Sequence, residues 1–423
     1  MKAFIEWFGC SANQSDAEQI KGFLKEKNYE FSSIKEADLV LINTCAVKEP
    51  TEFKMQKRIK FLLKEKKEEA KLVVFGCLPK INPEAVKKID SSLAMAGPNL
   101  EELTKILGMQ EESFSPKINE VRENEFVSII QIERGCLNNC TFCGTVLARG
   151  KLKSYSINEL NEKFRKAVKE TKEIWLTGQD TGCYGFDLGA SLPELLKELL
   201  KNEGNYRIRI GMMNPHHVKK IYKELIEVMK DKRMYKFLHI PIQSGSNKVL
   251  KEMARGYSIE TAKEVINELR KGIPGLALST DIIAGFPGET DEEFRETMNA
   301  LNEMEFDVVN ISRYGKRPGT FAAKRTDQVL GPIKKERSRI ASGIIKKISF
   351  KKNKEFEGTL QEVLVSSKGR TGMFVGRTSS YKQVIVKEDL RGKIINAKIR
   401  KAFTKHLDSM VLSEKTGLKI IGQ

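Results

Sequence analysis

Residues 126–314 alternate between short apolar runs and helical patterns, and this alternation constrains the fold of the 423-residue chain more than any other feature. Six runs predict strands: FVSIIQI (126–132), EIWLT (173–177), YRIRIG (206–211), FLHIPI (237–242), ALSTDIIAG (277–285) and VVNISRY (308–314). The segments between them predict helices at 157–170, 192–201, 218–230, 259–271 and 291–304. Six successive β/α units predict an incomplete parallel barrel, with its active face at the C-terminal ends of the strands.

Residues 1–110 show the same alternation and predict a separate, doubly wound α/β domain. Its predicted strands are KAFIEWF (2–8), DLVLIN (38–43) and KLVVF (71–75), and its main predicted helices are 15–27 and 51–67. Cys10, Cys45 and Cys77 each follow one of these strands. Because the carboxyl ends of parallel strands share one edge of a sheet, we expect the three thiols to converge there. The alternative is three separate buried cysteines that pack as small hydrophobes.

The C-terminal residues 356–423 predict a small antiparallel barrel, an architecture often used to hold nucleic acid. Its runs alternate apolar and polar residues: EGTLQEVLVSS (357–367), TGMFVGRTSS (371–380), QVIVKED (383–389) and KIINAKIRKAF (393–403). A Lys-rich helical stretch at 334–355 links it to a central domain of residues 122–355. Residues 334–423 hold 22 Lys and Arg against 8 Asp and Glu, which favours a polyanionic partner over a merely solvated basic surface.

The composition is that of a soluble protein, with 31% charged and 40% hydrophobic residues. No apolar run approaches the ~18 residues that span a bilayer, and the N-terminus lacks the pattern of a signal peptide. We therefore expect a cytoplasmic protein without a membrane partner, and a monomer. Thiols are held reduced in that compartment, so clustered cysteines indicate ligands rather than disulfides.

Three of the seven cysteines, Cys136, Cys140 and Cys143, form a C-x3-C-x2-C motif. Structural zinc sites close with four protein ligands, and all four histidines of the chain lie far away in sequence, which makes zinc the weaker interpretation. Thiolates are the usual ligands of iron–sulfur clusters, and three of them leave one iron of a four-iron cluster open to an external ligand. The motif therefore favours a 4Fe-4S cluster with an open iron.

The motif and the partial barrel together resemble the radical SAM enzymes, with Phe142 matching the usual aromatic residue of the cluster loop. The resemblance implies that the open iron binds S-adenosylmethionine, which an electron from the cluster cleaves to a carbon radical. It also implies that Gly178 and Gln179, after the second strand, orient the methionine part of this cofactor. Gln243 and Ser244, after the fourth strand, are further candidates; the alternative is ordinary turn and cap residues.

Further segments resemble the methylthiotransferases within that superfamily: FGCSANQSD (8–16), INTCAV (42–47), VVFGCLP (73–79), TDIIAGFPGET (280–290) and RPGTFAA (317–323). The resemblance covers essentially the whole chain. It implies that Cys10, Cys45 and Cys77 hold a second 4Fe-4S cluster, and that the tail is a TRAM domain that binds RNA. Apart from the cluster ligands it implies no catalytic side chain. Cys183 remains unassigned, and we interpret it as a free thiol.

The segment WLTGQDTGCYG (175–185) is most similar to methylthiotransferases that convert N6-threonylcarbamoyladenosine in tRNA to its 2-methylthio derivative. This resemblance implies modification of C2 at tRNA position 37, beside the anticodon, with the anticodon stem-loop as partner and a reductant and sulfur donor that the sequence does not identify. Arg149, Lys316 and Arg317 are candidates for contact with that substrate. The alternatives are isopentenyladenosine in tRNA, a ribosomal protein side chain, or a non-catalytic iron–sulfur protein that binds RNA.

Overall fold

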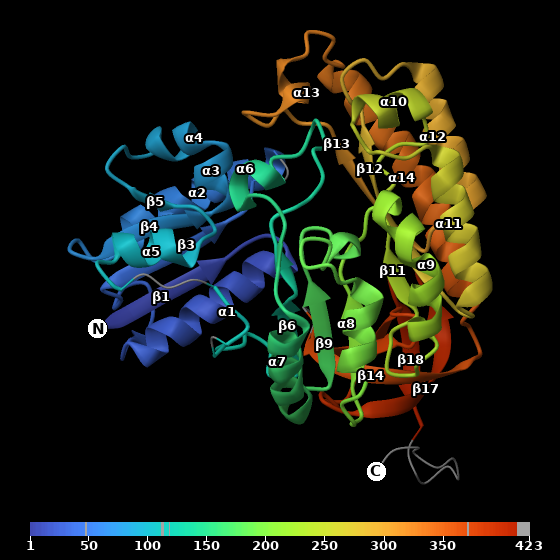
Figure 1. Cartoon of the computed structure of the whole chain (residues 1–423), viewed down its shortest axis with the longest axis horizontal. Helices are drawn as coiled ribbons and strands as arrows, with labels where there is room; N and C mark the ends of the chain where they lie inside the picture. The colour runs from blue at the N-terminus through green and yellow to red at the C-terminus, as the bar shows by residue number, and fades with distance from the viewer. Residues whose placement is uncertain (47–48, 111–113, 118, 370–371, 413–423) are drawn as a thin grey trace.

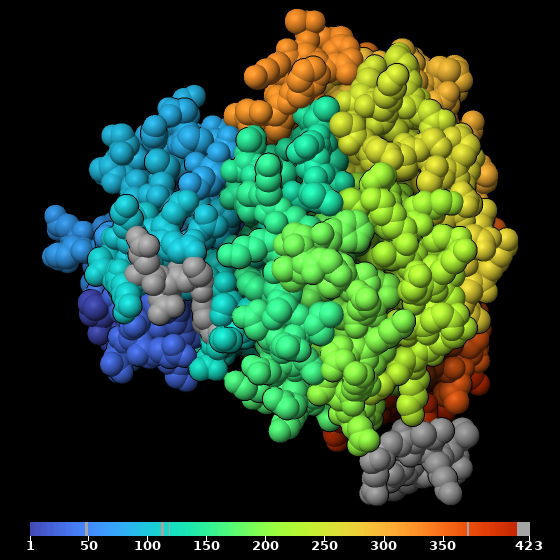
Figure 2. Space-filling model, viewed as in Figure 1, coloured from blue at the N-terminus to red at the C-terminus, as the bar shows by residue number. Residues whose placement is uncertain are grey.

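The computed structural model describes residues 1–46, 49–110, 114–117, 119–369 and 372–412. The chain forms an N-terminal α/β part, a central barrel and a small C-terminal barrel, coloured blue, green to orange, and red in Figure 1. The N-terminal part and the central barrel meet along one continuous seam (Figure 2). No helix among the described residues is both long enough and apolar enough to cross a bilayer.

The N-terminal part has a parallel five-stranded sheet in the order β2-β1-β3-β4-β5. Its strands are β1 (Lys2–Trp7), β2 (Glu30–Phe31), β3 (Leu39–Thr44), β4 (Lys71–Gly76) and β5 (Ala94–Ala96). Its helices are α1 (Ser11–Glu26), α2 (Glu49–Glu65), α3 (Cys77–Ile81), α4 (Pro83–Lys87) and α5 (Leu100–Ile106). Apolar residues of α1 and α5 pack on one face of the sheet, and those of α2, α3 and α4 pack on the other. The expected doubly wound arrangement is confirmed.

The six predicted strands of the central part are all present and run parallel in two three-stranded sheets, β10-β9-β6 and β11-β12-β13. They are β6 (Val127–Gln131), β9 (Glu173–Thr177), β10 (Arg207–Ile210), β11 (Phe237–His239), β12 (Ala277–Ala284) and β13 (Val308–Arg313). Bridges between Ile208 and Met234 and between Met212 and His239 join the two sheets. Among the described residues β6 and β13 do not pair, so the barrel is open between them, as six β/α units predict.

The barrel helices lie outside the strands: α7 (Ile157–Glu170), α8 (Leu192–Leu199), α9 (Pro215–Met229), α11 (Ile259–Gly272), α12 (Asp291–Met304) and α14 (Gly331–Lys354). Two of them begin at capping boxes, Ser156 with Glu159 and Thr290 with Glu293, which explains why their starts are readable from sequence. Short elements complete this part: β7 (Glu133–Arg134), α6 (Thr145–Arg149), β8 (Lys153–Ser154), η1 (Thr181–Cys183), α10 (Asn247–Glu252) and α13 (Phe321–Lys324).

The C-terminal part is a closed five-stranded barrel in the order β14-β15-β16-β18-β17. Its strands are β14 (Leu360–Lys368), β15 (Phe374–Thr378), β16 (Gln383–Val386), β17 (Ile394–Ala402) and β18 (Leu407–Val411). The neighbours pair antiparallel, as expected, except that β16 and β18 are parallel. The first residue of the predicted run TGMFVGRTSS (371–380) lies outside the described residues.

The small barrel packs against the N-terminal ends of the central strands. The Lys236 N–H, just before β11, donates to the Ser379 carbonyl at 2.7 Å. The Lys382 ammonium group pairs with Asp307, just before β13, at 2.6 Å, and both side chains are buried. Ser380 donates to the Gly275 carbonyl at 2.8 Å, just before β12. The small barrel is therefore fixed at the end of the central barrel opposite to the C-terminal ends of its strands (Figure 1).

Candidate active site

The loop that carries Cys136, Cys140 and Cys143 leaves the barrel after β6 and is closed at its base by the antiparallel pair β7–β8. The Cys136 N–H donates to the Gly150 carbonyl at 3.2 Å, which brings the two ends of the loop together. Gly135 has a φ of +75°, and a Cβ there would lie 2.0 Å from the Lys151 carbonyl oxygen, so only glycine fits. The loop therefore holds its three half-buried thiols beside the C-terminal end of β6.

Each sulfur of this loop lies near a hydrogen-bond donor. The Asn138 N–H and Nδ2 lie 3.5 and 3.4 Å from Cys136 Sγ, and Arg255 Nη1 lies 3.1 Å from Cys140 Sγ. The Thr145 N–H lies 3.4 Å from Cys143 Sγ. Burial raises the pKa of Cys136 to about 12 and also raises that of Cys143, so these thiols become thiolates only when a cation such as iron binds them.

The structure brings Cys10, Cys45 and Cys77 together at the C-terminal edge of the N-terminal sheet, as the ends of β1, β3 and β4 predict. The sulfurs of Cys10 and Cys77 lie 3.7 and 3.9 Å from the same atom, Asn13 Oδ1. Gly9, with a φ of +119°, lets the chain pass Cys45, because a Cβ there would lie 2.9 Å from the Cβ of Cys45. Burial raises the pKa of Cys77 to about 12, and the nearby thiols of Cys10 and Cys45 add to this rise.

The two groups of thiols are adjacent, because α6 and α3 pack together. Gly144, next to Cys143, faces Ile81 of α3 so closely that a Cβ would lie 2.8 Å from Ile81 Cδ1. Helix α3 itself begins at Cys77. At the other end of α6, Arg149 is buried and pairs with Asp16 of α1 at 2.6 Å. The structure thus places Arg149 between the two groups of cysteines and corrects the expectation that it meets a substrate.

Of the candidate cofactor residues, Gly178 and Gln179 lie at the C-terminal end of β9, beside Glu133. A Cβ at Gly178 would lie 2.5 Å from Glu133 Cγ, so glycine is required there. Gln179 Oε1 and Glu133 Oε2 are buried without a hydrogen-bond partner among the described residues. Burial and the charge of Asp180 raise the pKa of Glu133 well above its usual value. These open polar atoms suit a polar ligand.

The remaining candidates are Phe142, in the cysteine loop, and Gln243 and Ser244, after β11. Phe142 packs against the apolar cluster that includes Phe286 and Tyr314. Gln243 has a φ of +65° and pairs through its backbone with β12. The Ser244 hydroxyl lies 3.1 Å from the Thr297 hydroxyl of α12, and its role toward a cofactor stays a prediction.

A polar network next to Cys136 was not predicted from the sequence. Asn138 Nδ2 donates to Asp180 Oδ2 at 2.6 Å, and His217 Nε2 lies 3.1 Å from Asn138 Oδ1. Burial lowers the pKa of His217 to about 4, so its ring is neutral and Nε2 donates to Asn138. Cys183 is fully buried in the same region and donates to the Asp180 carbonyl at 3.1 Å. The sequence signals for this network are the position of Asn138 within the cysteine motif and the positions of Asp180 and His217 after the second and third predicted strands.

A pocket of about 310 Å³ opens between the N-terminal part and the loop after β13. The Arg317 side chain in its wall is buried and donates to Glu52 Oε2 at 2.6 Å and to the carbonyl of Ala46 at 3.4 Å. Lys316 is exposed in the same wall, beside the exposed ring of Phe53. Arg317 is therefore a structural contact between the two parts, whereas Lys316 remains accessible.

The open six-stranded barrel with a three-cysteine loop at its C-terminal end defines a radical SAM protein, and a family model described as the radical SAM superfamily matches residues 130–301. Models described as uncharacterized protein family UPF0004 and as the TRAM domain match residues 2–96 and 354–412. The solved radical S-adenosylmethionine methyltransferase TsrM from Kitasatospora setae has the same fold, with a TM-score of 0.56 and 12% identity over 76% of this chain and 77% of that chain.

Relatives with higher sequence identity show to which family within this superfamily the chain belongs. The "probable threonylcarbamoyladenosine tRNA methylthiotransferase" of Pyrococcus abyssi is 41% identical over 98% of this chain and its own full length. The Homo sapiens protein named threonylcarbamoyladenosine tRNA methylthiotransferase is 36% identical over 94% of this chain and 72% of that protein. The chain belongs to the threonylcarbamoyladenosine tRNA methylthiotransferase family and is an enzyme. Its radical SAM domain implies a 4Fe-4S cluster and S-adenosylmethionine as cofactors.

Proposed function

We propose that this enzyme adds a methylthio group to C2 of N6-threonylcarbamoyladenosine at tRNA position 37, next to the anticodon. The observation that carries the proposal is the adjacency of two groups of three cysteines, because the reaction joins radical formation with sulfur transfer. An aromatic C–H bond is not acidic enough for removal by an ordinary general base, so a carbon radical is needed. A site for radical formation and a site for sulfur must then lie close together.

In this proposal Cys136, Cys140 and Cys143 hold one 4Fe-4S cluster, and Cys10, Cys45 and Cys77 hold a second. The donor set fits, because thiolates are the preferred ligands of iron–sulfur clusters and each group supplies three. A cluster held by the first group would supply the electron that cleaves S-adenosylmethionine, and one held by the second group would supply the sulfur. Asn138, Arg255 and Thr145 direct their N–H groups at the sulfurs of the first group.

Gly178 and Gln179 are proposed to orient the methionine part of S-adenosylmethionine, and Gln243, Ser244 and Phe142 are proposed as further cofactor-binding residues. The unpartnered Gln179 Oε1 supports this role, since it can accept a hydrogen bond from an ammonium group. The unpartnered Glu133 Oε2 is a second polar atom at the same position. We propose the pocket beside Lys316 for the carboxylate of the threonylcarbamoyl group, because the Lys316 ammonium is its accessible cation.

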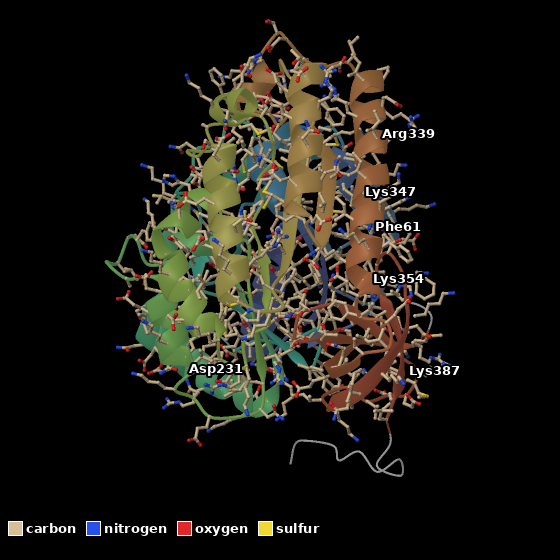
Figure 3. The ribbon with its side chains drawn as sticks, turned by 90° about the vertical axis from the view of Figure 1, so that its right-hand side faces the viewer. Phe61, Asp231, Arg339, Lys347, Lys354 and Lys387 are labelled. Atoms are coloured by element: carbon tan, nitrogen blue, oxygen red, sulfur yellow. The ribbon has the colours of Figure 1, made fainter. Side chains whose placement is uncertain are left out.

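Residues 356–423 are proposed to bind the tRNA, together with α14 of the central domain (122–355), while residues 1–110 carry the second cluster. Helix α14 contains nine Lys and Arg and one acidic residue. Figure 3 shows Arg339, Lys347 and Lys354 of α14 and Lys387 of the small barrel along one edge of the molecule. This basic ridge runs from the end that carries the cysteines toward the small barrel, and basic side chains bind phosphates by releasing counterions. We place the reaction in the cytoplasm.

The experiment is expression of the chain in a host whose tRNA contains N6-threonylcarbamoyladenosine without the methylthio group, followed by mass spectrometry of tRNA nucleosides. The 2-methylthio derivative of this nucleoside is expected, and a Cys77→Ala variant is expected to abolish it. Methylthio groups on isopentenyladenosine or on a ribosomal protein instead would contradict the proposed substrate. Anaerobic incubation with S-adenosylmethionine and dithionite tests catalysis itself, because a non-catalytic RNA-binding protein forms neither 5′-deoxyadenosine nor methionine.

A further inference from the structure

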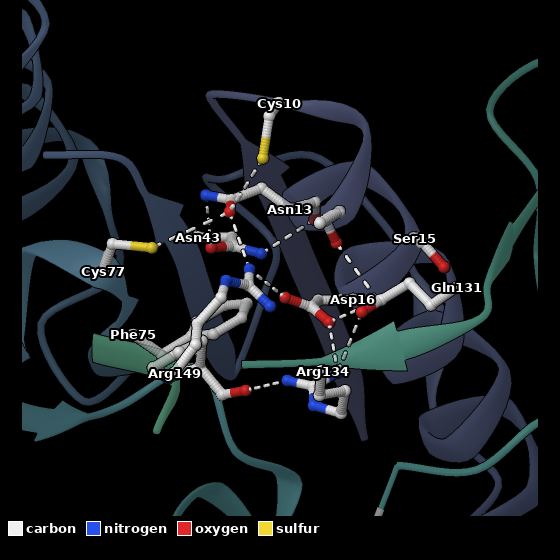
Figure 4. Close-up of polar contacts among 12 residues, drawn as sticks. Cys10, Asn13, Ser15, Asp16, Asn43, Phe75, Cys77, Gln131, Arg134 and Arg149 are labelled. Atoms are coloured by element: carbon white, nitrogen blue, oxygen red, sulfur yellow. Dashed lines mark hydrogen bonds and ion pairs between the residues drawn. The ribbon is translucent and has the colours of Figure 1, made fainter. Parts of the chain in front are cut away.

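Arg149 extends from the end of the first cysteine loop into the N-terminal part. It is the last residue of α6, and its side chain is 3% exposed. Its Nη2 donates to Asn13 Oδ1 at 2.8 Å and to Asp16 Oδ2 at 2.6 Å, both on α1 (Figure 4). The residue next to it, Gly150, accepts the backbone hydrogen bond of Cys136. Arg149 is thus attached to one group of thiols through its backbone and reaches the other through its side chain.

The charges around Arg149 do not balance among the side chains. Asp16 is fully buried and also accepts from Arg134 Nη1 at 2.8 Å and from Gln131 Nε2 at 2.7 Å. Burial alone would raise the pKa of Asp16, but the two guanidinium groups hold it below its usual value. Among the side chains that the structure describes, one carboxylate therefore serves two arginines, and one positive charge is left over. A buried cation without a counter-charge is costly, so an additional anion is expected in this position.

The thiols of the second group are the nearest source of that anion. Asn13 Oδ1, which accepts from Arg149, also lies 3.7 Å from Cys10 Sγ and 3.9 Å from Cys77 Sγ (Figure 4). Arg149 Nη1 is buried and has no hydrogen-bond partner among the described residues. A donor and a positive charge are therefore available beside these sulfurs.

We propose that Arg149 is a positioning residue that sets the reduction potential of the cluster held by Cys10, Cys45 and Cys77. The inference depends on the proposed function, which assigns a cluster to these cysteines. Reduction adds one negative charge to a cluster, and a nearby buried cation stabilises the reduced form and raises the potential. Arg255 lies 3.1 Å from Cys140 of the other group, so a buried guanidinium accompanies each group of thiols.

The test measures this potential in the full chain with Cys136, Cys140 and Cys143 replaced by alanine, so that a single cluster remains. The protein is reconstituted anaerobically with iron and sulfide and titrated with dithionite and redox mediators, while the reduced cluster is followed by electron paramagnetic resonance. Arg149→Gln is expected to shift the reduction equilibrium at least tenfold toward the oxidised form, a fall of about 59 mV for one electron. Arg149→Lys, which keeps the charge, is expected to remain closer to the parent.

Asp16→Asn makes the test specific for charge, because removal of the carboxylate increases the excess positive charge. Its potential is expected to rise, opposite to that of Arg149→Gln, whereas a general loosening of the site moves both in the same direction. Arg255→Gln in the same background is the matched control and is expected to leave the potential unchanged, since it contacts Cys140. Iron content per chain is measured for every variant.

Shifts in the same direction for Arg149→Gln and Asp16→Asn, or no shift with full iron content, would overturn the proposal. If Arg149→Gln fails to retain iron, Asp16→Asn decides: a rise supports the role of charge, and a fall or no change refutes it. If the parent protein binds no iron after replacement of the three loop cysteines, Cys10, Cys45 and Cys77 do not hold a cluster. That result refutes the proposed function and the inference with it, and it is distinguishable from every result on Arg149.

Discussion

Glu18 of α1 is expected to make the stability of the N-terminal part depend on pH near neutrality. The residue is 1% exposed; its Oε1 accepts from Gln14 and from the Glu123 N–H at 3.0 and 3.1 Å, and its Oε2 has no hydrogen-bond partner among the described residues. Burial raises the pKa of Glu18 from 4.5 to about 7, because the two hydrogen bonds do not compensate for the lost hydration of the carboxylate.

A carboxyl group whose pKa is raised in the folded state stabilises that state while it is protonated. This contribution is fully present below pH 4.5, falls as the pH rises, and is lost above pH 7. At 1.36 kcal/mol per pKa unit, the free energy of unfolding loses about 3 kcal/mol across this window. The Gln side chain of Glu18→Gln stays neutral at every pH. The free energy of unfolding of the variant, relative to that of the parent, is therefore expected to rise by about 3 kcal/mol from pH 4.5 to pH 8.

The assay is urea unfolding of the reduced apoprotein in a Trp175→Phe background, where Trp7 on β1 is the only tryptophan and reports on the N-terminal part. Glu84→Gln, on the exposed surface of α4, is the control for loss of a charge in the same part of the chain. The reasoning would be refuted if the difference in free energy of unfolding between Glu18→Gln and its parent stayed constant from pH 4.5 to pH 8.

Three further outcomes are expected. Arg317→Met leaves a buried carboxylate without its cation and is expected to lower the free energy of unfolding by about 3–5 kcal/mol in the same Trp7 assay; a loss below about 1 kcal/mol contradicts the ion pair. Lys347→Ala with Lys387→Ala is expected to weaken tRNA binding and to reduce the salt dependence of log K by roughly 1 to 2, whereas an unchanged slope argues against the basic ridge. Cys140→Ala is expected to abolish formation of 5′-deoxyadenosine, while Cys10→Ala retains it and loses only the methylthio product; loss of both activities in Cys10→Ala would count against separate roles.

The fold was largely predictable because its determinants are local. Capping boxes mark the starts of α7 and α12, and runs of apolar residues mark each central strand. The convergence of Cys10, Cys45 and Cys77 followed from a general property of parallel sheets, which places the ends of neighbouring strands at one edge. The parallel pairing of β16 with β18 was not predictable, since a short strand after a turn carries no local signal for its partner.

The surroundings of the thiols could not be read from the sequence, because they depend on contacts between distant segments. Arg149 and Asp16 are 133 residues apart, and Arg255 is 115 residues from Cys140. A basic residue near a cysteine motif is ambiguous in sequence, since an exposed arginine and a buried one have the same letter. Arg149 was therefore expected at a substrate surface, and only the packing of α6 on the N-terminal part reveals its ion pair.

The attachment of the small barrel at the far end of the central barrel imposes a length requirement on the RNA. Helix α14, with 24 residues, spans about 36 Å along the edge that separates the small barrel from the cysteines. An RNA that places a nucleotide at the cysteine end and a phosphate on the small barrel must then be a stiff, folded molecule at least as long as α14. If the small barrel binds the tRNA as proposed, free nucleosides and short single strands would engage one end only. The enzyme would then distinguish a structured RNA from its fragments by length before any base is recognised.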